Sequence, residues 1–169
     1  MAERAAVKWL GLLGWIVLTF LAAAIGSQFM PGAWYASLAK PSWNPPGWVF
    51  GPVWTVLYLL MAIAAWLVWR AAGLTGARLA LACYLLQLVL NAAWSWLFFG
   101  RQSISGALAD IIALWALILL TMVLFRRHSA TAAALLVPYL LWVSFATALN
   151  FALFRLNGPG FTSKLWPVP

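Results

Sequence analysis

Tryptophan is the most frequent residue in this sequence that could recognise a ligand. There are thirteen among 169 residues, and each indole ring offers a flat apolar face and one N–H donor. Trp54 lies four residues before Tyr58, and Trp142 lies four residues before Ala146. On a helix, this spacing puts both members of a pair on one face. The two stripes predict either ordinary core packing or flat aromatic walls around an apolar ligand.

A second set of candidate residues is polar. Gln87, Asn91 and Ser95 follow one another at steps of four, so they share one helix face. Polar groups are costly in lipid, and this face therefore points into a bundle. Two interpretations stay open: hydrogen bonds between helices, each contributing ~0.6 kcal/mol on average, or a polar strip inside a pocket. Asn150 lies on the stripe of Trp142 and Ala146.

A stiff loop over residues 30–46 separates the first two apolar runs. Its prolines fix φ and restrict the residues before them. Trp34, Tyr35, Trp43 and Trp48 lie in or beside it, as in the aromatic belts at membrane interfaces. Such a belt explains the position of the aromatic residues better than it explains the stiffness of the loop. The alternative is a lid over an apolar cavity, with Lys40 and Asn44 as candidate partners for a ligand's acidic groups.

Few residues could support acid–base, metal or nucleophilic chemistry. Asp110 is the only acid inside an apolar run, so it is either functional or neutralised by a proton or a partner. His128 stands beside two arginines, and Cys83 is typical of a small apolar residue. The sequence holds no metal-binding cluster, phosphate loop or catalytic triad. It predicts no metal site and no obligatory cofactor.

Composition places these residues in a membrane. Hydrophobic residues make up 66% of the chain and charged residues 7%, against about 45–50% and 25% in soluble domains. These values exclude a soluble globular domain and a disordered chain. The net charge of +8 comes from cations that lie almost entirely between apolar runs, where they anchor helix ends at headgroups. No nucleic-acid partner is predicted.

The charges divide the chain into five apolar windows, each able to supply the ~20 residues of one membrane span. We therefore predict an all-α integral membrane protein, a bundle of five transmembrane helices in one domain over residues 1–157. Pro138 predicts a kink in the last helix. The segment 158–169 is expected to be a flexible tail. The helices are predicted near 8–29, 47–70, 77–99, 104–126 and 131–155.

The first helix and the orientation each leave an alternative open. The first run resembles a cleavable signal peptide, but its length and the bulky Trp15 favour a retained helix. Six Lys or Arg residues fall on the side of the N-terminus and four on the other. This bias predicts a cytoplasmic N-terminus, with reversed or dual insertion as alternatives.

Four segments of the chain resemble the family of translocator proteins and tryptophan-rich sensory proteins, once called peripheral benzodiazepine receptors. They are WYASLAKPSWNPPGWVFGPVWTVLY (34–58), QLVLNAAWSWLFFG (87–100), GALAD (106–110) and VPYLLWVSFATALNF (137–151). The resemblance covers about residues 10–157. It implies a five-helix membrane bundle, often dimeric, that binds protoporphyrin and related tetrapyrroles and small apolar drugs, and in some members cholesterol. It also suggests a bacterial cell membrane, or the mitochondrial outer membrane if the source is eukaryotic.

The resemblance also implies a set of site residues. A ligand-binding pocket under the first loop would be formed by Tyr35, Trp43, Pro46, Trp54, Asn91, Trp142 and Ala146. Trp54 and Trp142 match tryptophans implicated in light-dependent porphyrin breakdown. The proposed sterol motif falls on Leu149, Phe151 and Arg155. There the family's central tyrosine is replaced by Phe151, which lacks the hydroxyl donor, so sterol binding is in doubt.

Three functions follow as hypotheses. The first is a membrane receptor or sensor that holds porphyrins and apolar small molecules in an aromatic pocket. The second is an enzyme that degrades porphyrin photochemically with Trp54 and Trp142. The third is a translocator of sterol or porphyrin, although secondary transporters usually show internal repeats and coupling sites that this sequence lacks. The expected partners are porphyrins, apolar small molecules, membrane lipid, cholesterol in doubt, and a second copy of the chain.

Overall fold

Long charge-free runs form the five apolar helices that dominate the structure. The structure is a computed structural model. It describes residues 2–158, with side chains described from Trp9 onward. Each of these helices is long and apolar enough to cross a membrane, the last counted with the short helix before it. The described residues form helices and loops without a strand, which confirms an all-α membrane bundle. The long helices are α1 (Ala2–Gly26), α3 (Phe50–Gly76), α4 (Arg78–Ser95), α5 (Ile104–Arg126) and α7 (Val137–Asn157).

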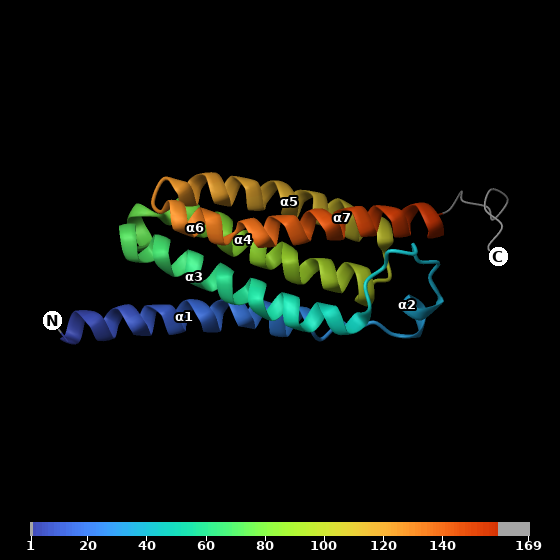
Figure 1. Cartoon of the computed structure of the whole chain (residues 1–169), viewed down its shortest axis with the longest axis horizontal. Helices are drawn as coiled ribbons and strands as arrows, with labels where there is room; N and C mark the ends of the chain where they lie inside the picture. Colours follow the sequence, from blue (N-terminus) through green and yellow to red (C-terminus); the bar gives the residue numbers. More distant parts are fainter. Residues whose placement is uncertain (1, 159–169) are drawn as a thin grey trace.

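The helices form an elongated bundle with their axes roughly along one direction (Figure 1). Helix α1 packs on α3 and α4, and α5 packs between α4 and α7. Three alanines of α3, Ala62, Ala64 and Ala65, are fully buried and let neighbouring helices approach closely. Larger side chains, among them Tyr84 and Phe125, fill the remaining core.

Several helix ends differ from the predicted ones. The predicted span 8–29 starts earlier, at Ala2, and ends at Gly26, where a turn begins. The span 47–70 opens with a 3-10 turn, Gly47–Val49, and runs on to Gly76. Gly73 has φ +68°, which only glycine adopts without strain, so the helix changes direction there and continues for one more turn.

The third and fifth spans are interrupted. Helix α4 ends at Ser95 and passes into a π-helical segment, Trp96–Gly100. The predicted span 131–155 is two helices, α6 (Ala130–Leu135) and α7. Pro138 stands in the first turn of α7, where its missing N–H costs nothing, so it breaks the predicted helix instead of kinking it. Helix α5 covers the predicted range 104–126.

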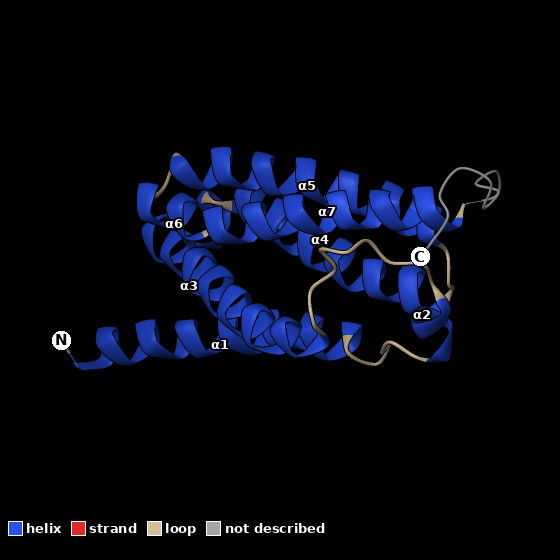
Figure 2. Cartoon of the chain, turned by 45° about the vertical axis from the view of Figure 1, so that its right-hand side comes forward, coloured by secondary structure: helices blue, strands red, loops and turns tan. Residues whose placement is uncertain are grey.

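The first loop carries a short helix, α2 (Ala33–Ser37), and runs across one end of the bundle (Figure 2). One side chain at the end of α7 holds the backbone of this loop by two hydrogen bonds. The backbone N–H of Ala39 donates to Asn157 Oδ1 at 2.9 Å, and Asn157 Nδ2 donates to the Ala39 carbonyl at 2.9 Å. The tail predicted over 158–169 lies outside the described residues beyond Gly158.

Candidate functional site

The two tryptophans singled out by sequence meet across the interface of α3 and α7. The ring centroids of Trp54 and Trp142 are 6.5 Å apart, with the planes at 85°. Trp54 also stacks on Tyr58 at 5.3 Å and meets the edge of Tyr139 at 6.2 Å. Both tryptophans are half-buried, so part of each indole ring stays exposed at the surface of the protein. The structure thus groups these aromatic rings, and a ligand role for them stays a prediction.

The aromatic contacts continue outward from Trp142 to the first loop. Trp142 contacts Phe145 at 5.6 Å, and Phe145 contacts Trp43 of the loop at 5.8 Å. Phe50, at the start of α3, meets Trp142 at 5.7 Å. Trp43 is 47% exposed, so the series of rings begins at the surface of the loop and ends in the core. We call Trp43, Phe145, Trp142, Trp54 and Tyr58 the aromatic path.

Sequence reasoning missed Phe50, Phe145 and Tyr139. A spacing signal for each was present, since Phe50 precedes Trp54 by four residues and Tyr139 and Phe145 flank Trp142 at three. That spacing places them near the predicted rings on their own helices. It does not say which part of α7 faces α3, and that pairing is what makes them part of the site.

A buried amide lies at the inner end of the aromatic path. Asn91 Oδ1 accepts a hydrogen bond from the Tyr58 hydroxyl, and Asn91 Nδ2 donates to the Tyr139 hydroxyl oxygen at 3.1 Å. All three residues are buried. Asn91 therefore ties α3, α4 and α7 together directly beneath Trp54. Of the two interpretations left open by sequence, the hydrogen bonds between helices are present at this position.

Gln87 and Ser95, the other members of the polar stripe, and Asn150 of α7 differ from Asn91 in their hydrogen-bond partners. Gln87 is fully buried, and neither of its amide atoms has a partner within the described residues. Ser95 is half-buried next to Gly26 of α1. Asn150 Oδ1 accepts from Trp94 Nε1 at 3.0 Å, and Asn150 Nδ2 donates to the Ile104 carbonyl at 3.1 Å. Asn150 thus joins α7 to α4 and to the start of α5.

Tyr35, expected in the same pocket, lies in a neighbouring cluster. Its ring meets Phe98 at 6.1 Å and Phe99 at 5.6 Å, both in the π-helical segment. Its hydroxyl donates to Asn44 Oδ1 at 3.2 Å. Burial raises the pKa of the Tyr35 phenol above its ordinary value of 10.0. Phe145 packs against this cluster too, so the aromatic path and the Tyr35 cluster adjoin there.

The two residues considered as partners for acidic ligand groups are already engaged. Lys40 Nζ donates to the Ala36 carbonyl at 3.2 Å and to the Leu38 carbonyl at 3.1 Å, and it lies 4.7 Å from the centre of the Tyr35 ring. Asn44 accepts from Tyr35. These contacts lie at the surface, where a ligand carboxylate could replace a carbonyl as the partner of an ammonium group.

The remaining predicted site residues differ in burial. Pro46 is exposed and precedes the 3-10 turn, and Ala146 is half-buried against the main core. Of the sterol motif, Leu149 points into the core with 7% exposure, whereas Phe151 is 50% exposed. The Arg155 guanidinium lies 6.0 Å from the Phe151 ring centre. Only Phe151 and Arg155 therefore share an open face.

Asp110 of α5 is half-buried. One of its oxygens, Oδ2, is buried without a hydrogen-bond partner in the described part of the chain. No group of three His, Cys, Asp or Glu residues that could hold a metal ion occurs among the described residues. Cys83 is buried as a free thiol.

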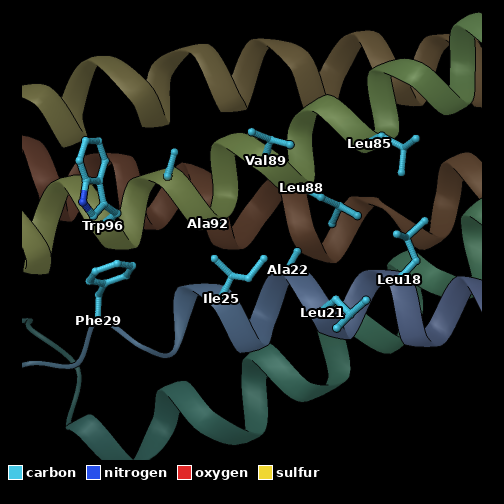
Figure 3. A pocket seen from close by; sticks show the side chains of 11 residues that line it. Leu18, Leu21, Ala22, Ile25, Phe29, Leu85, Leu88, Val89, Ala92 and Trp96 are labelled. Carbon is cyan, nitrogen blue, oxygen red and sulfur yellow. The ribbon is translucent and has the colours of Figure 1, made fainter.

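An apolar groove lies on the outside of the bundle between α1 and α4, with a volume of about 660 Å³ (Figure 3). It is separate from the aromatic path, because none of the five residues of that path lines it. Its floor is formed by small residues such as Ala22 and Ala92, and its rim by Leu, Ile, Val and aromatic side chains. The side chains of Leu21, Ile25 and Val89 are more than half exposed there, which is typical of a face that contacts lipid.

Comparison with known proteins decides the family. The sequence model of the TspO/MBR family matches residues 15–156. The chain belongs to the TspO/MBR family. That interval includes the aromatic path, Asn91 and the first loop.

Members of the family from distant organisms align over most of their length. The tryptophan-rich protein TspO of Chlorobaculum tepidum is 47% identical over 139 residues, covering 78% of this chain and 86% of the relative. The tryptophan-rich sensory protein of Cereibacter sphaeroides is 44% identical over 147 residues (84% and 91%). The translocator protein of Homo sapiens is 40% identical over 157 residues (90% and 93%). The chain is thus a multi-pass membrane protein of a family whose members carry sensory and translocator names.

Proposed function

We propose that this protein is a membrane receptor that binds porphyrins, such as protoporphyrin IX or haem-type tetrapyrroles, and small apolar drug-like molecules. The observation that supports it best is the aromatic path, which leads from the exposed Trp43 to the buried pair Tyr58 and Asn91. Apolar ligand sites are built in this way, from aromatic walls and a few polar groups. The receptor would serve tetrapyrrole sensing or transport in the membrane of a bacterial cell.

In this proposal, a flat ligand enters from the first loop and stacks on Trp54 or Trp142. Trp54 and Trp142 meet edge to face, so a porphyrin stacks on one of them only after the other rotates. Phe145 and Trp43 lie along the route from the loop, and Lys40 stands at its mouth to receive a propionate. Such a site accepts ligands that are flat and apolar with an acidic edge, the chemistry of a porphyrin dicarboxylate.

The test is a titration of the purified protein with protoporphyrin IX, followed by quenching of tryptophan fluorescence. The variant Trp54→Ala, Trp142→Ala is expected to bind at least tenfold more weakly. The control is Trp48→Ala, which removes a ring that is 77% exposed and outside the aromatic path. If the double variant binds as tightly as the wild type, the stacking site is wrong.

A second function is favoured by one observation. Trp54 lies in contact with both Trp142 and Tyr58, so two further oxidisable rings stand next to any porphyrin bound on it. Such a group could support light-dependent breakdown of the pigment. Illumination of the protein with protoporphyrin IX, followed by the Soret absorbance, tests this. An equal rate of loss with Trp54→Phe and Trp142→Phe would exclude a role for the two indoles.

A further inference from the structure

Three arginines of this protein lie at one end of the bundle. Arg78 is the first residue of α4, Arg126 is the last residue of α5, and Arg127 follows it. Helices α4 and α5 run in opposite directions along each other, so the start of one lies beside the end of the other (Figure 1). All three side chains are exposed. We call Arg78, Arg126 and Arg127 the arginine end.

No described carboxylate neutralises this end. From Trp9 onward, where side chains are described, the only acid is Asp110. It lies sixteen residues before Arg126 on α5, which is about 24 Å along the helix. In α1, the sequence adds two cations, Arg4 and Lys8, and one acid, Glu3. Three neighbouring guanidinium groups repel one another, and an anion from outside the chain would relieve that repulsion.

A fourth arginine at the same end is held by aromatic rings. The Arg70 guanidinium lies 4.6 Å from the centre of the Trp66 ring, and Trp66 stacks on Trp9 of α1 at 6.3 Å. Tryptophan rings gather at the level of lipid headgroups. A guanidinium held by a cation–π contact can still donate its N–H groups, and their planar fork matches the geometry of a phosphate. Arg70 is therefore positioned at the depth where phosphates lie.

The cations at the opposite end each lie against a different partner. Lys40 donates to two backbone carbonyls. Arg101 lies over Trp96 with 5.6 Å to the ring centre, and Arg155 lies over Phe151. They come from three separate elements: the first loop, the end of the π-helical segment and α7. Both ends thus carry basic residues, but at the arginine end Arg126 and Arg127 are adjacent in the chain and lie at the end of α5 beside the start of α4, whereas at the opposite end each cation stands on a separate element.

We infer that the arginine end, together with Arg70, is a binding site for the phosphate headgroups of anionic phospholipids. The exposed apolar side chains of the helices below it provide the surface on which the acyl chains of such a lipid would lie. A lipid with a neutral headgroup would gain no comparable interaction. This inference is independent of the proposed porphyrin site, which lies near the other end of the bundle.

The test compares two triple variants that lose the same charge. The first is Arg78→Gln, Arg126→Gln, Arg127→Gln, and the control is Lys40→Gln, Arg101→Gln, Arg155→Gln. Binding of phosphatidylglycerol and phosphatidylcholine to each purified protein is measured by native mass spectrometry in detergent. Each basic residue near an anionic surface contributes about a fivefold factor. We expect the first variant to lose its preference for phosphatidylglycerol about a hundredfold and the control less than fivefold.

Two further measurements keep the result decisive. Thermal unfolding of the first variant in phosphatidylcholine nanodiscs reports whether it folds; should it not fold, the single variant Arg127→Gln, expected to lose about fivefold, replaces it. Competition with millimolar inorganic phosphate separates a lipid from a free anion. Equal losses in the two triple variants would show that net charge alone attracts the lipid and would overturn the site. Displacement of the lipid by inorganic phosphate would overturn the lipid as its occupant.

Discussion

Gly11 allows the ring of Trp69 to approach α1 closely, and an added methyl group there would test how α1 and α3 pack. A Cβ atom built on Gly11 would lie 2.2 Å from Trp69 Cζ3 and 2.5 Å from Cη2, whereas real Cβ atoms essentially never approach closer than 3.0 Å. To restore an ordinary contact of 3.4 Å, the ring must move by about 1 Å. Trp69 is half-buried between the helices, so its ring cannot simply swing into open space.

The matched control is Gly14→Ala, three residues further along α1. A Cβ on Gly14 would meet nothing within 4 Å. Both alanines gain the same helix propensity, up to about 1 kcal/mol over glycine, so the difference between the variants isolates the overlap. Overpacking of this kind costs about 1–3 kcal/mol. We therefore expect Gly11→Ala to be less stable than Gly14→Ala by that amount.

Thermal unfolding in detergent, followed by fluorescence-detected size-exclusion chromatography, measures the difference. The double variant Gly11→Ala, Trp69→Ala should show less than the sum of the two single losses, because the overlap disappears with the ring. Equal melting temperatures for Gly11→Ala and Gly14→Ala would refute the reasoning, since they would mean that α1 and α3 accommodate the added methyl group without loss of stability.

Four further outcomes follow from buried polar groups and from the first loop. Gln87→Met should leave the free energy of unfolding unchanged or raise it, because an apolar side chain of similar size replaces an amide without a partner in the described structure. Asn91→Leu should lower it by about 2–5 kcal/mol, since two buried tyrosine hydroxyls lose their partner, and chemical unfolding of both variants compares the two. Asn157→Ala should speed hydrogen exchange at Ala39 without lowering the melting temperature by more than a few degrees. Tyr35 should ionise above pH 10 in an absorbance titration at 295 nm, because burial disfavours its charged form; its contribution to stability is present below pH 10 and is lost as the pH rises through the raised pKa.

The bundle itself could be predicted from sequence because membrane helices obey a simple constraint. A run of ~20 residues without charge has few alternatives to a helix in lipid. The residues at which the helices end were harder to predict, because they depend on local backbone conformation. The positive φ of Gly73 lets α3 continue past its predicted end, and Pro138 begins a new helix after Leu136. The π-helical turn after Ser95 has no signature in composition.

The candidate site was predicted in part. Trp54 and Trp142 were chosen by their stripes, and the structure places their rings in contact. Tyr35, predicted to contact the same ligand, lies in the neighbouring cluster with Phe98 and Phe99, which adjoins the aromatic path at Phe145. Its role in ligand binding stays a prediction. The periodicity of one helix indicates which of its faces carries the candidate site residues. It does not say at what depth two helices cross, and that depth decides which aromatic residues meet.

The contact between Asn157 and Ala39 joins positions that are 118 residues apart in the chain. One carboxamide gives the loop both an acceptor and a donor, as an adjacent strand would, so the loop gains a partner without being part of a sheet. If the loop lifts when a ligand enters, both hydrogen bonds break together, and the last turn of α7 is released from the backbone of Ala39. A spectroscopic label on the last turn of α7 would therefore report the opening of the loop without touching the aromatic path.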